Sequence, residues 1–502
     1  MVINTVALYA KICIKTIVML FSTRIALNCL GTSEYGLYNL IAGVIVLLSF
    51  VNGAFMISVQ RYLSIAIGAR NDEKLSEIFN ASFSLHFLFA IVLGLLLFLI
   101  EPLLFNGFLN IPQESVDTAI TVYRIMICSA MLTVIAIPYS AELNAHEDLA
   151  FFALTEVVVS VVQLLAAVLL LFISYNLLQH YTVMMILAVI SGTVLKYVWC
   201  RKKYAEVKLV WSKLINYSLM KEMVGFVGWN AIGSFSVVGR NQGIAVLLNI
   251  VCGTIANAAY GIANQVNSLV LTFATTLTAV FTPAIIQCHG ANDNSKMRDL
   301  AIVSSKMSFL LSTVIALPVI VFIKEILEVW LGNYPAQTDI YCVCVIVAFV
   351  VTQTYPGINR AIYAIGTIKA YQIVTSVCLL ATIPAGYLCV AAGLPAYSIL
   401  IVLVAMQSVT ILITAYYGYK VASFDFRSLF MRVFLPELFL FSLFTLGAII
   451  AKIHLFAVSG ILSFTLTTII LILYSGVFYY IVFDSSERRR LSGIVKQIIR
   501  LK

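Results

Sequence analysis

The sequence predicts an all-α polytopic membrane protein with about 14 transmembrane helices, arranged as two six-helix lobes plus two C-terminal helices. Three observations predict this class. Hydrophobic residues make up 62% of the 502 residues and charged residues only 11%, whereas soluble globular chains carry about 25% charged residues. Apolar windows of about 20 residues, long enough to cross a bilayer as a helix, recur along the chain. Short sequence patterns from the first half of the chain also recur in the second half, which indicates an internal repeat.

The apolar windows give the predicted helices in order. The N-terminus lacks a short apolar stretch followed by a small-residue cleavage site, so the first window is predicted to be a retained helix. The predicted spans are 5–28, 37–60, 79–100, 118–141, 150–173, 180–200, 223–249, 256–284, 302–323, 339–362, 371–391, 395–418, 432–453 and 457–483.

The placement of basic residues predicts the orientation of these spans. If both termini are cytoplasmic, loops on that side contain Arg70, Lys74 and the basic segment 196–221, whereas the opposite segment 101–117 has no Lys or Arg. The acidic loop 142–149 departs from this pattern, but acidic residues contribute little to orientation. The formal charge of +9 therefore reflects topology, and no nucleic-acid partner is predicted.

Two segments recur in the sequence with nearly the same spacing. Gly68-Ala69-Arg70-Asn71-Asp72-Glu73-Lys74-Leu75-Ser76-Glu77-Ile78 aligns with Gly290-Ala291-Asn292-Asp293-Asn294-Ser295-Lys296-Met297-Arg298-Asp299-Leu300 at an offset of 222 residues, where a glycine, an alanine, a lysine, an apolar residue, an acid and another apolar residue coincide. Tyr35-Gly36 and Tyr260-Gly261 are 225 residues apart and follow small polar turns at Gly31 and Gly253. Because six helices separate the copies, both halves enter the membrane in the same direction. This indicates a parallel repeat with a pseudo-two-fold axis along the membrane normal, whose interface is the expected site.

The predicted domain organisation follows from this repeat. Two segments, a linker at 201–221 and a tail at 484–502, combine Lys and Arg with an apolar stripe. This combination is typical of segments that lie on an anionic membrane surface. The predicted parts are an N-terminal lobe at 1–200, a basic cytoplasmic linker at 201–221, a C-terminal lobe at 222–418, two additional helices at 432–483 and a basic amphipathic tail at 484–502.

Two arginines within apolar spans are candidates for a substrate site. An arginine at the centre of a membrane helix costs roughly 2.5–3.5 kcal/mol on insertion scales, so it usually faces protein, water or a ligand. Arg24 lies in the first span and Arg240 in the seventh, one from each half of the repeat. A guanidinium group fits phosphate bidentately. The alternatives are snorkelling of Arg24 to the outer interface and a packing role for the small-residue stripe around Arg240.

Other charged and amide side chains extend this candidate cavity. Lys15, beside Lys11, predicts either a portal for an anionic headgroup or a topology charge, and Arg61 is either a substrate contact or an interfacial residue. Glu156 could bind a coupling proton or form an ion pair with a basic residue. Asn28, Asn230 and Gln242 could contact sugar hydroxyls or pack helices. The predicted substrate-binding residues are Arg24, Arg240, Lys15, Arg61, Asn28, Asn230 and Gln242, with Glu156 as the candidate coupling site.

No enzymatic or cofactor motif is present in the sequence. It contains no phosphate-binding loop, and its ten cysteines are scattered through apolar segments without CxxC spacing. We therefore expect no cofactor, no metal and no catalytic residues.

Several short patterns resemble one known family. The run Ser22-x-Arg24, Leu27-Asn28, Leu30-Gly31, Tyr35-Gly36, Tyr38 and Asn39, together with Gln60-Arg61-Tyr62-Leu63-Ser64 and the amide-rich stretch 228–267, resembles the Wzx-type oligosaccharide flippases. These are similar to the wider multidrug/oligosaccharidyl-lipid/polysaccharide exporter superfamily, which includes the MATE transporters. The resemblance is spread over the chain and is strongest at 22–64 and 228–267.

This resemblance implies a function and a set of partners. Such a flippase moves an undecaprenyl-diphosphate-linked oligosaccharide from the cytoplasmic to the outer leaflet of the bacterial inner membrane, for polysaccharide biosynthesis, by alternating access driven by an ion gradient. It implies a monomer, with a polysaccharide polymerase as a further candidate partner.

Two other functions remain open from the sequence. A MATE-like small-molecule antiporter would be expected to carry carboxylates in its cavity for cationic drugs, whereas the deep charges here are mostly basic. A membrane-embedded polymerase or glycosyltransferase would be expected to carry a sizeable exoplasmic loop, and the outside loops predicted here are short.

Overall fold

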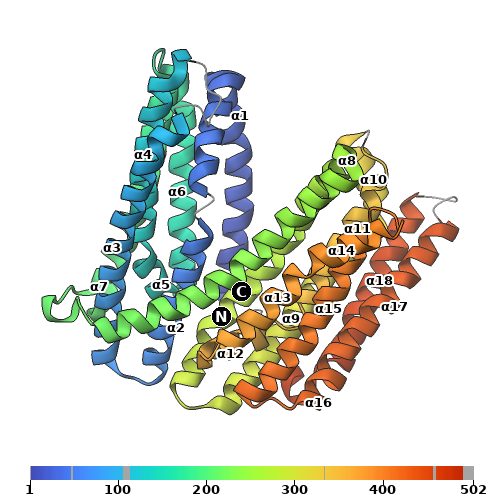
Figure 1. The fold of residues 1–502 in the computed structure, drawn as a ribbon. Coiled ribbons are helices and arrows are strands. Elements are labelled where there is room, and N and C mark those ends of the chain that lie inside the picture. Colours follow the sequence, from blue (N-terminus) through green and yellow to red (C-terminus); the bar gives the residue numbers. More distant parts are fainter. Residues whose placement is uncertain (1, 47–48, 106–112, 333, 456–459, 490–502) are drawn as a thin grey trace. The chain divides into compact units, whose positions relative to one another are not determined.

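The computed structural model describes residues 2–46, 49–105, 113–332, 334–455 and 460–489, and these residues form helices and no strand (Figure 1). Eleven of the described helices are long and apolar enough to cross a membrane, and one bent helix pair adds a twelfth candidate. The prediction of an all-α polytopic membrane protein is therefore confirmed.

Two predicted spans are not among these candidates. The predicted span 37–60 is divided between α1 (Val2–Val46) and α2 (Ser49–Gly68) by residues 47–48, which lie outside the described residues. The predicted span 256–284 lies in the second part of α8, which is helical from Tyr217 to Gly290. The candidate span within α8 ends at Cys252, directly before the glycine at which the sequence predicts a turn.

The chain divides into two compact units, Ile3–Ala231 and Ile232–Lys502. In unit 1, α3 packs against α4, α4 and α6 pack against α7, and α2 packs against α5. A left-handed φ of 73° at Gly31 breaks α1 where the sequence predicts a turn. The helices of unit 1 are α1 (Val2–Val46), α2 (Ser49–Gly68), α3 (Asp72–Leu103), α4 (Val116–Ile135), α5 (Ile137–Ala145), α6 (Leu149–Leu169) and α7 (Leu177–Lys203), followed by the short turns η4 (Ala205–Val207) and η5 (Trp211–Lys213).

Unit 2 contains the larger part of α8 and the remaining helices. Its packing parallels that of unit 1, because α11 packs on α15 as α4 packs on α7. A bend of 46° separates α11 from α12, where Pro356 begins the second helix. The helices are α9 (Asn294–Val321), α10 (Ile323–Leu331), α11 (Thr338–Thr352), α12 (Pro356–Ile365), α13 (Lys369–Leu380), α14 (Thr382–Ala391), α15 (Ser398–Ala422), α16 (Phe426–Leu429), the π-helical turn η6 (Phe430–Phe434), α17 (Leu435–Leu455) and α18 (Gly460–Ile481).

The two loops that match in sequence also match in structure. Asn71 caps α3 by accepting a hydrogen bond from the Lys74 amide at 2.9 Å, and Asp293 caps α9 by accepting one from the Lys296 amide at 3.0 Å. The preceding residue has a positive φ in both loops, and the same set of backbone hydrogen bonds recurs at an offset of 222 residues. Such equivalence in both sequence and hydrogen bonding is what an internal duplication predicts.

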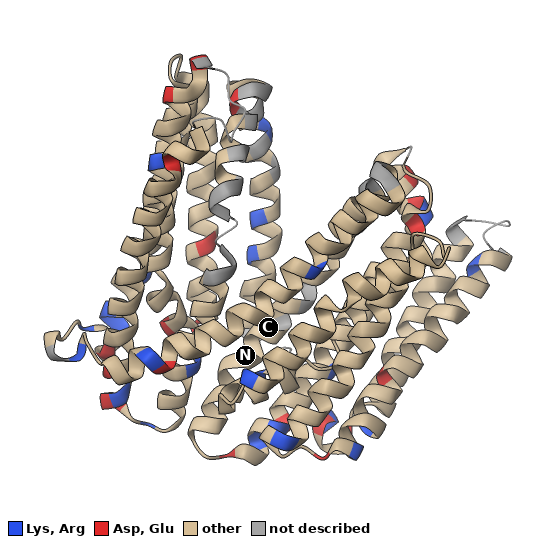
Figure 2. Cartoon of the chain, in the orientation of Figure 1, with Lys and Arg blue, Asp and Glu red and all other residues tan. Residues whose placement is uncertain are grey.

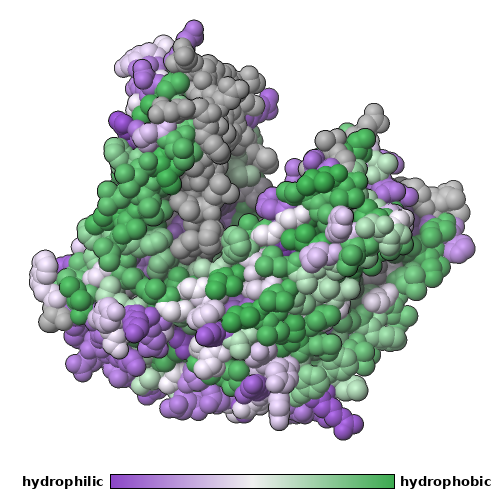
Figure 3. All heavy atoms as spheres, in the orientation of Figure 1, coloured by the Kyte–Doolittle hydropathy of each residue, from purple (hydrophilic) through white to green (hydrophobic). Residues whose placement is uncertain are grey.

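The helices present large apolar surfaces to their surroundings. Figure 2 shows Lys, Arg, Asp and Glu gathered mainly toward the helix ends within each unit, with long uncharged stretches between them. Figure 3 shows a broad hydrophobic face over α3 and α4. A contiguous apolar face of this extent would aggregate in water and is stable in lipid. On α3 the exposed apolar residues include Phe87, Leu88, Leu95, Leu96 and Leu99.

Candidate functional site

A pocket of about 360 Å³ lies inside unit 2, around Arg240. Its walls come from α8, α11, α12, α13 and α15, and most of its polar groups are amides and hydroxyls. The polar lining residues are Arg240, Asn241, Tyr260, Asn264, Asn267, Thr275, Thr352, Gln353, Tyr355, Asn359 and Gln407.

Arg240 is the charged side chain of this pocket. It is 7% exposed, and its Nε and Nη2 atoms donate to Oδ1 of the neighbouring Asn241 at 3.2 and 2.9 Å. Its buried Nη1 atom has no hydrogen-bond partner among the described residues. A buried guanidinium that retains an unused donor is a strong binding group for an anionic oxygen atom.

Helix geometry brings the amides of this pocket together. Tyr260, Asn264 and Asn267 are spaced by four and three residues on α8, so their side chains share one face. The break between α11 and α12 places Gln353 and Tyr355 at the pocket wall, because the chain leaves helical geometry there. The pocket thus combines one cation with amides that can both donate and accept hydrogen bonds.

The described lining of the Arg240 pocket contains no Asp or Glu. The positive charge of Arg240 is therefore not neutralised by a carboxylate of the pocket wall. Chemically, such a site suits a hydroxyl-rich or anionic ligand better than an organic cation.

A cluster of charged residues lies inside unit 1. Nζ of Lys196 on α7 lies 3.1 Å from one oxygen of Glu156 on α6, and Nζ of Lys15 on α1 lies 3.6 Å from the other. Nζ atoms of Lys11 and Lys196 lie 5.3 and 5.1 Å from the ring centre of Phe152. Three ammonium groups thus surround one carboxylate, and the net charge of the cluster, which we call the lysine cluster, is positive.

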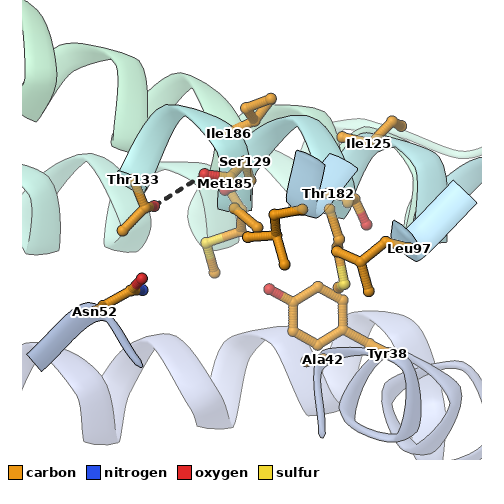
Figure 4. A pocket seen from close by; sticks show the side chains of 13 residues that line it. Tyr38, Ala42, Asn52, Leu97, Ile125, Ser129, Thr133, Thr182, Met185 and Ile186 are labelled. Carbon is orange, nitrogen blue, oxygen red and sulfur yellow. Dashed lines mark hydrogen bonds between the residues drawn. The ribbon is translucent and has the colours of Figure 1, made fainter. Parts of the chain in front are cut away.

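A second pocket lies in unit 1 between α1, α2, α3, α4 and α7 and encloses about 240 Å³ (Figure 4). Tyr38 and Asn52 project toward it from one side, and Ser129, Thr133 and Thr182 lie on the other. The Thr133 hydroxyl donates to the Ser129 carbonyl at 2.9 Å. With aliphatic residues and methionines between these groups, the pocket is mostly apolar and its described lining carries no charge.

Arg61 is buried within unit 1, close to the end of α2. Its guanidinium carbon lies 4.9 Å from the ring centre of Tyr62 and 5.0 Å from that of Phe226 on α8. The Tyr62 hydroxyl donates to Glu222 at 3.0 Å. Cation–π contacts of this kind stabilise a buried guanidinium and join α2 to the start of α8.

The remaining sequence-predicted site residues lie apart from these groups. Arg24 and Asn28 are exposed on α1, one turn apart, and Gln242 is exposed on α8 although it is two residues from Arg240. Asn230 is buried on α8. The structure thus brings Lys15 to Glu156 and places Arg240 in a polar pocket, but it does not bring Arg24, Asn28, Asn230 or Gln242 into either pocket.

Among the described residues, one cluster has ligand atoms close enough to hold a metal ion, since those of Glu142, His146 and Glu206 all lie within 4.8 Å of one another. His146 Nε2 lies 3.0 Å from Glu142 and 2.8 Å from Glu206, and its ring stacks on Tyr204. Burial lowers the pKa of His146, but the two carboxylates outweigh this effect and raise it to about 9. The three groups form an ion-pair network that joins α5 to η4, in which His146 hydrogen-bonds to Glu206 while neither oxygen of Glu142 has a hydrogen-bond partner among the described residues.

The acidic loop that departs from the predicted charge pattern is compensated locally. Asp148 accepts hydrogen bonds from Lys203 and Trp199 at 2.8 Å and from Tyr204 at 3.1 Å. Burial raises the pKa of Asp148, but these three donors, with the charge of Lys203, lower it below its usual value. The loop thus pairs with the basic end of α7.

Sequence reasoning missed several groups of these sites. Several residues reach the Arg240 pocket from parts of the chain that follow more than 100 residues later: Gln353 and Tyr355 from the break between α11 and α12, Asn359 from α12 and Gln407 from α15. Lys196 was counted among the basic residues of the cytoplasmic side because it lies near the end of its predicted span, 180–200. One signal was available for the α11–α12 wall: the proline at position 356 within a predicted span indicates a broken helix.

Comparisons with known proteins identify the fold. A model of the MatE family matches residues 231–388. No curated protein has a significant sequence match to the chain. Among solved structures, a MATE P26A mutant aligns with a TM-score of 0.73 and 15% identity over 84% of this chain and 95% of that chain.

Two further solved structures are similar to this chain. An outward-facing multidrug resistance MATE family transporter of the MOP superfamily has a TM-score of 0.72 at 14% identity, covering 84% of this chain and 95% of that chain. A MOP superfamily transporter from Pyrococcus furiosus, described as having a binding pocket of reverse polarity, has a TM-score of 0.72 at 14% identity, covering 85% of this chain and 95% of that chain. The chain therefore has the fold of the MATE transporters, with a match to the MatE family over residues 231–388.

Proposed function

We propose that the protein is a flippase that carries an undecaprenyl-diphosphate-linked oligosaccharide from the cytoplasmic to the outer leaflet of the bacterial inner membrane. The observation that carries this proposal is the pocket of Arg240, in which a buried guanidinium is surrounded by amides and hydroxyls and faces no carboxylate of the wall. The guanidinium would bind the diphosphate, and the amides would bind sugar hydroxyls.

The size of the pocket limits what it would hold. A volume of about 360 Å³ lies at the lower end of the range for small-ligand sites. It would therefore hold the diphosphate and the first sugar, while the isoprenoid tail stays in lipid. We assign the lysine cluster, with its excess of positive charge, to the first capture of the anionic headgroup.

The transport cycle would be alternating access between the proposed lobes 1–200 and 222–418, joined by the linker 201–221. A ligand drives such a change only if it binds the two states with different affinities. An ion gradient would supply the remaining drive. Both termini would be cytoplasmic, and a polysaccharide polymerase would be the enzyme that uses the delivered glycan.

A MATE-like small-molecule antiporter is the second candidate. The MatE match at 231–388 and the similarity to a multidrug resistance transporter favour it. The absence of Asp and Glu from the described lining of the Arg240 pocket counts against a cationic drug as its ligand. A fold does not by itself determine the ligand, and the Pyrococcus furiosus transporter of this fold is described as having a binding pocket of reverse polarity that suggests a different function.

Direct binding to the purified protein distinguishes the two candidates. The full chain in lipid nanodiscs would be titrated with undecaprenyl diphosphate and with tetraphenylphosphonium, following intrinsic tryptophan fluorescence. We expect binding of undecaprenyl diphosphate that weakens about tenfold to a hundredfold in Arg240→Ala, as loss of a charged hydrogen bond predicts, and changes little in the exposed control Arg201→Ala. Binding of tetraphenylphosphonium alone would favour the antiporter.

A further inference from the structure

Glu437 on α17 is a carboxyl group without a partner. Its side chain is fully buried, and neither oxygen atom has a hydrogen-bond partner among the described residues. An ionised carboxylate that is excluded from water and lacks hydrogen bonds is strongly disfavoured. This carboxyl therefore holds a proton in the conformation described.

Charged neighbours surround Glu437 from the elements that pack against α17. On α9, Nζ of Lys306 lies 2.7 and 3.0 Å from the two carboxylate oxygens of Glu487, which follows α18. Both groups interact electrostatically with Glu437. From α18, Tyr474 faces the same region, with its hydroxyl 2.7 Å from Thr313.

Two further charges lie at the edge of this region. Arg432 on η6 is exposed, and Asp484 uses its side chain to accept from the backbone amides of residues 486 and 487. The buried core of the group is therefore one lysine and two carboxyls. Such a group is electrically neutral only when one of the two carboxyls carries a proton, which makes it a site for one exchangeable proton.

The proton site is joined mechanically to the Arg240 pocket through α9. Ser305, next to Lys306, accepts a hydrogen bond from the backbone amide of Gly357 at 3.0 Å. A side chain at Gly357 would collide with the Ala301 carbonyl, so α9 and α12 are in direct backbone contact there. Asn359, two residues further along α12, lines the pocket.

The opposite end of α17 is also tied to α9 and α10. Nζ of Lys452 donates to the Val321 carbonyl at 2.8 Å and to Glu325 at 2.7 Å. With Glu437 near Lys306 at one end and Lys452 at the other, α17 contacts α9 at both of its ends. A charge change at Glu437 therefore acts on the helix that supports the pocket wall.

Glu156, the residue that sequence reasoning selects for coupling, has a different environment. Its two oxygens face the ammonium groups of Lys196 and Lys15 at 3.1 and 3.6 Å. Two cations stabilise the ionised carboxylate and oppose proton binding.

We propose that Glu437, with Lys306 and Glu487, is a proton-binding site of unit 2 whose occupancy is coupled to ligand binding at the Arg240 pocket. The identity of the coupled ligand in this inference rests on the proposed transport function. Proton binding at Glu437 does not depend on that function. One proton adds to the carboxylate when the site opens to water and leaves from the same oxygen when ligand binding moves α9. No other bond forms or breaks.

Infrared difference spectroscopy of the full chain in nanodiscs tests proton binding without a substrate. We expect a carbonyl band of a protonated carboxyl that appears and disappears with pH, that is lost in Glu437→Gln and that is kept in the control Glu156→Gln. In Glu487→Gln, Lys306 is free to pair with Glu437, so the band should appear only at a lower pH. Spectra in which wild type and Glu437→Gln show the same pH-dependent carboxyl bands, or a Glu437 band that does not respond to pH, would overturn the proposal.

A second arm tests coupling with undecaprenyl diphosphate as the probe. In weakly buffered solution, binding to the wild-type protein should change the pH of the medium by a measurable proton release or uptake. Glu437→Gln should lose this change, and its affinity for the probe should lose the pH dependence that the wild-type affinity shows. Wild-type binding without a proton change contradicts the coupling. No wild-type binding, together with a pH-dependent Glu437 band, contradicts the proposed substrate and leaves the proton site standing.

Discussion

Unit 1 and unit 2 stabilise buried charge in different ways. In unit 1, Glu156 lies among lysines that neutralise it, and Arg61 lies against aromatic rings. In unit 2, the described residues give Arg240 only the amide of Asn241 as a hydrogen-bond partner and leave one of its donors unused. Because a buried cation without a counterion is unfavourable, Arg240 is the group that gains most from an anionic ligand.

The sequence identified Arg240 but not its neighbours, for a physical reason. A charged residue in the middle of an apolar span can be recognised from the amino-acid sequence alone. The amides opposite it, such as Gln353 and Gln407, look like ordinary polar residues of packed helices until the fold brings them together. The sequence pattern alone can also mislead: Arg24 is likewise an arginine within an apolar span, and yet its side chain is exposed.

His146 gives a prediction for stability against pH. Its pKa is raised from 6.5 to about 9 in the folded protein, because the two carboxylates outweigh the effect of burial. Its stabilising contribution is therefore complete below about pH 6.5 and is lost as the pH rises through 9. We expect His146→Gln to lower the free energy of unfolding by about 1.5–3 kcal/mol at pH 6 and by much less at pH 10.

Thermal unfolding in detergent, measured from pH 6 to pH 10 for both proteins, checks this expectation. The two curves should converge at high pH. A difference between them that does not depend on pH would show that His146 acts by packing on Tyr204 and not by its charge.

At the scale of elements, the two equivalent loops predict equivalent energetics. Asn71 and Asp293 each cap a helix through one side-chain hydrogen bond. We expect Asn71→Ala and Asp293→Ala each to cost about 0.5–2 kcal/mol of unfolding free energy. Because the caps lie in separate units, the double variant should show the sum of both costs.

Chemical denaturation of the single and double variants measures these costs. Asn71→Asp serves as the control, since Asp also accepts the hydrogen bond at a helix N-terminus. Strong non-additivity would mean that the loops are energetically coupled despite their separation in sequence.

The contact of α9 with α12 gives a second prediction at this scale. A Cβ at Gly357 meets the Ala301 carbonyl, which is backbone and cannot move aside as a side chain does. We expect Gly357→Ala to destabilise the protein by about 1–3 kcal/mol. The control is Gly261→Ala on α8, where no atom lies within 4 Å of the new Cβ, so that variant should be neutral or slightly stabilising.

Melting temperatures of the two alanine variants test this packing of α9 against α12. Binding of undecaprenyl diphosphate to the same variants adds a functional measurement. Gly357→Ala should weaken binding as well, because α12 carries part of the pocket wall. Equal melting temperatures for both variants would mean that α9 and α12 are less tightly packed than the structure indicates.

Helix ends were predictable where the local chemistry is strong. Glycine at position 31 marks a break because it adopts a left-handed φ of 73°, and the matched loops carry recognisable cap residues. The sequence predicts one continuous span at 339–362, whereas the structure has a bend there between α11 and α12. The bend does not show in the hydropathy because the residues on both sides of it are apolar. Hydropathy detects burial in lipid but not the direction of a helix.

At the scale of the whole molecule, the arrangement of basic residues predicts sidedness. Glu114 is exposed beside a loop that is predicted to be outside, and Glu73 is exposed at the start of α3, predicted to be inside. In a variant without its ten cysteines, a membrane-impermeant maleimide should label Glu114→Cys in intact spheroplasts. Glu73→Cys should react only after the membrane is permeabilised, and the reverse pattern would invert the proposed orientation.

The fold class followed from composition because the membrane imposes a simple requirement. Every backbone group in lipid must be paired, so long apolar windows can only be helices. The ligand did not follow in the same way, since one fold can carry sites of different chemistry. The substrate must therefore be measured.

The most direct measurement is the sidedness of the undecaprenyl-diphosphate-linked oligosaccharide in cells that lack the protein, restored with wild type, Arg240→Ala or the control Arg201→Ala. The account predicts that completed units accumulate in the inner leaflet without the protein and with Arg240→Ala. Wild type and the control should restore delivery to the outer leaflet. Normal delivery in cells without the protein would contradict the flippase account and favour the small-molecule antiporter.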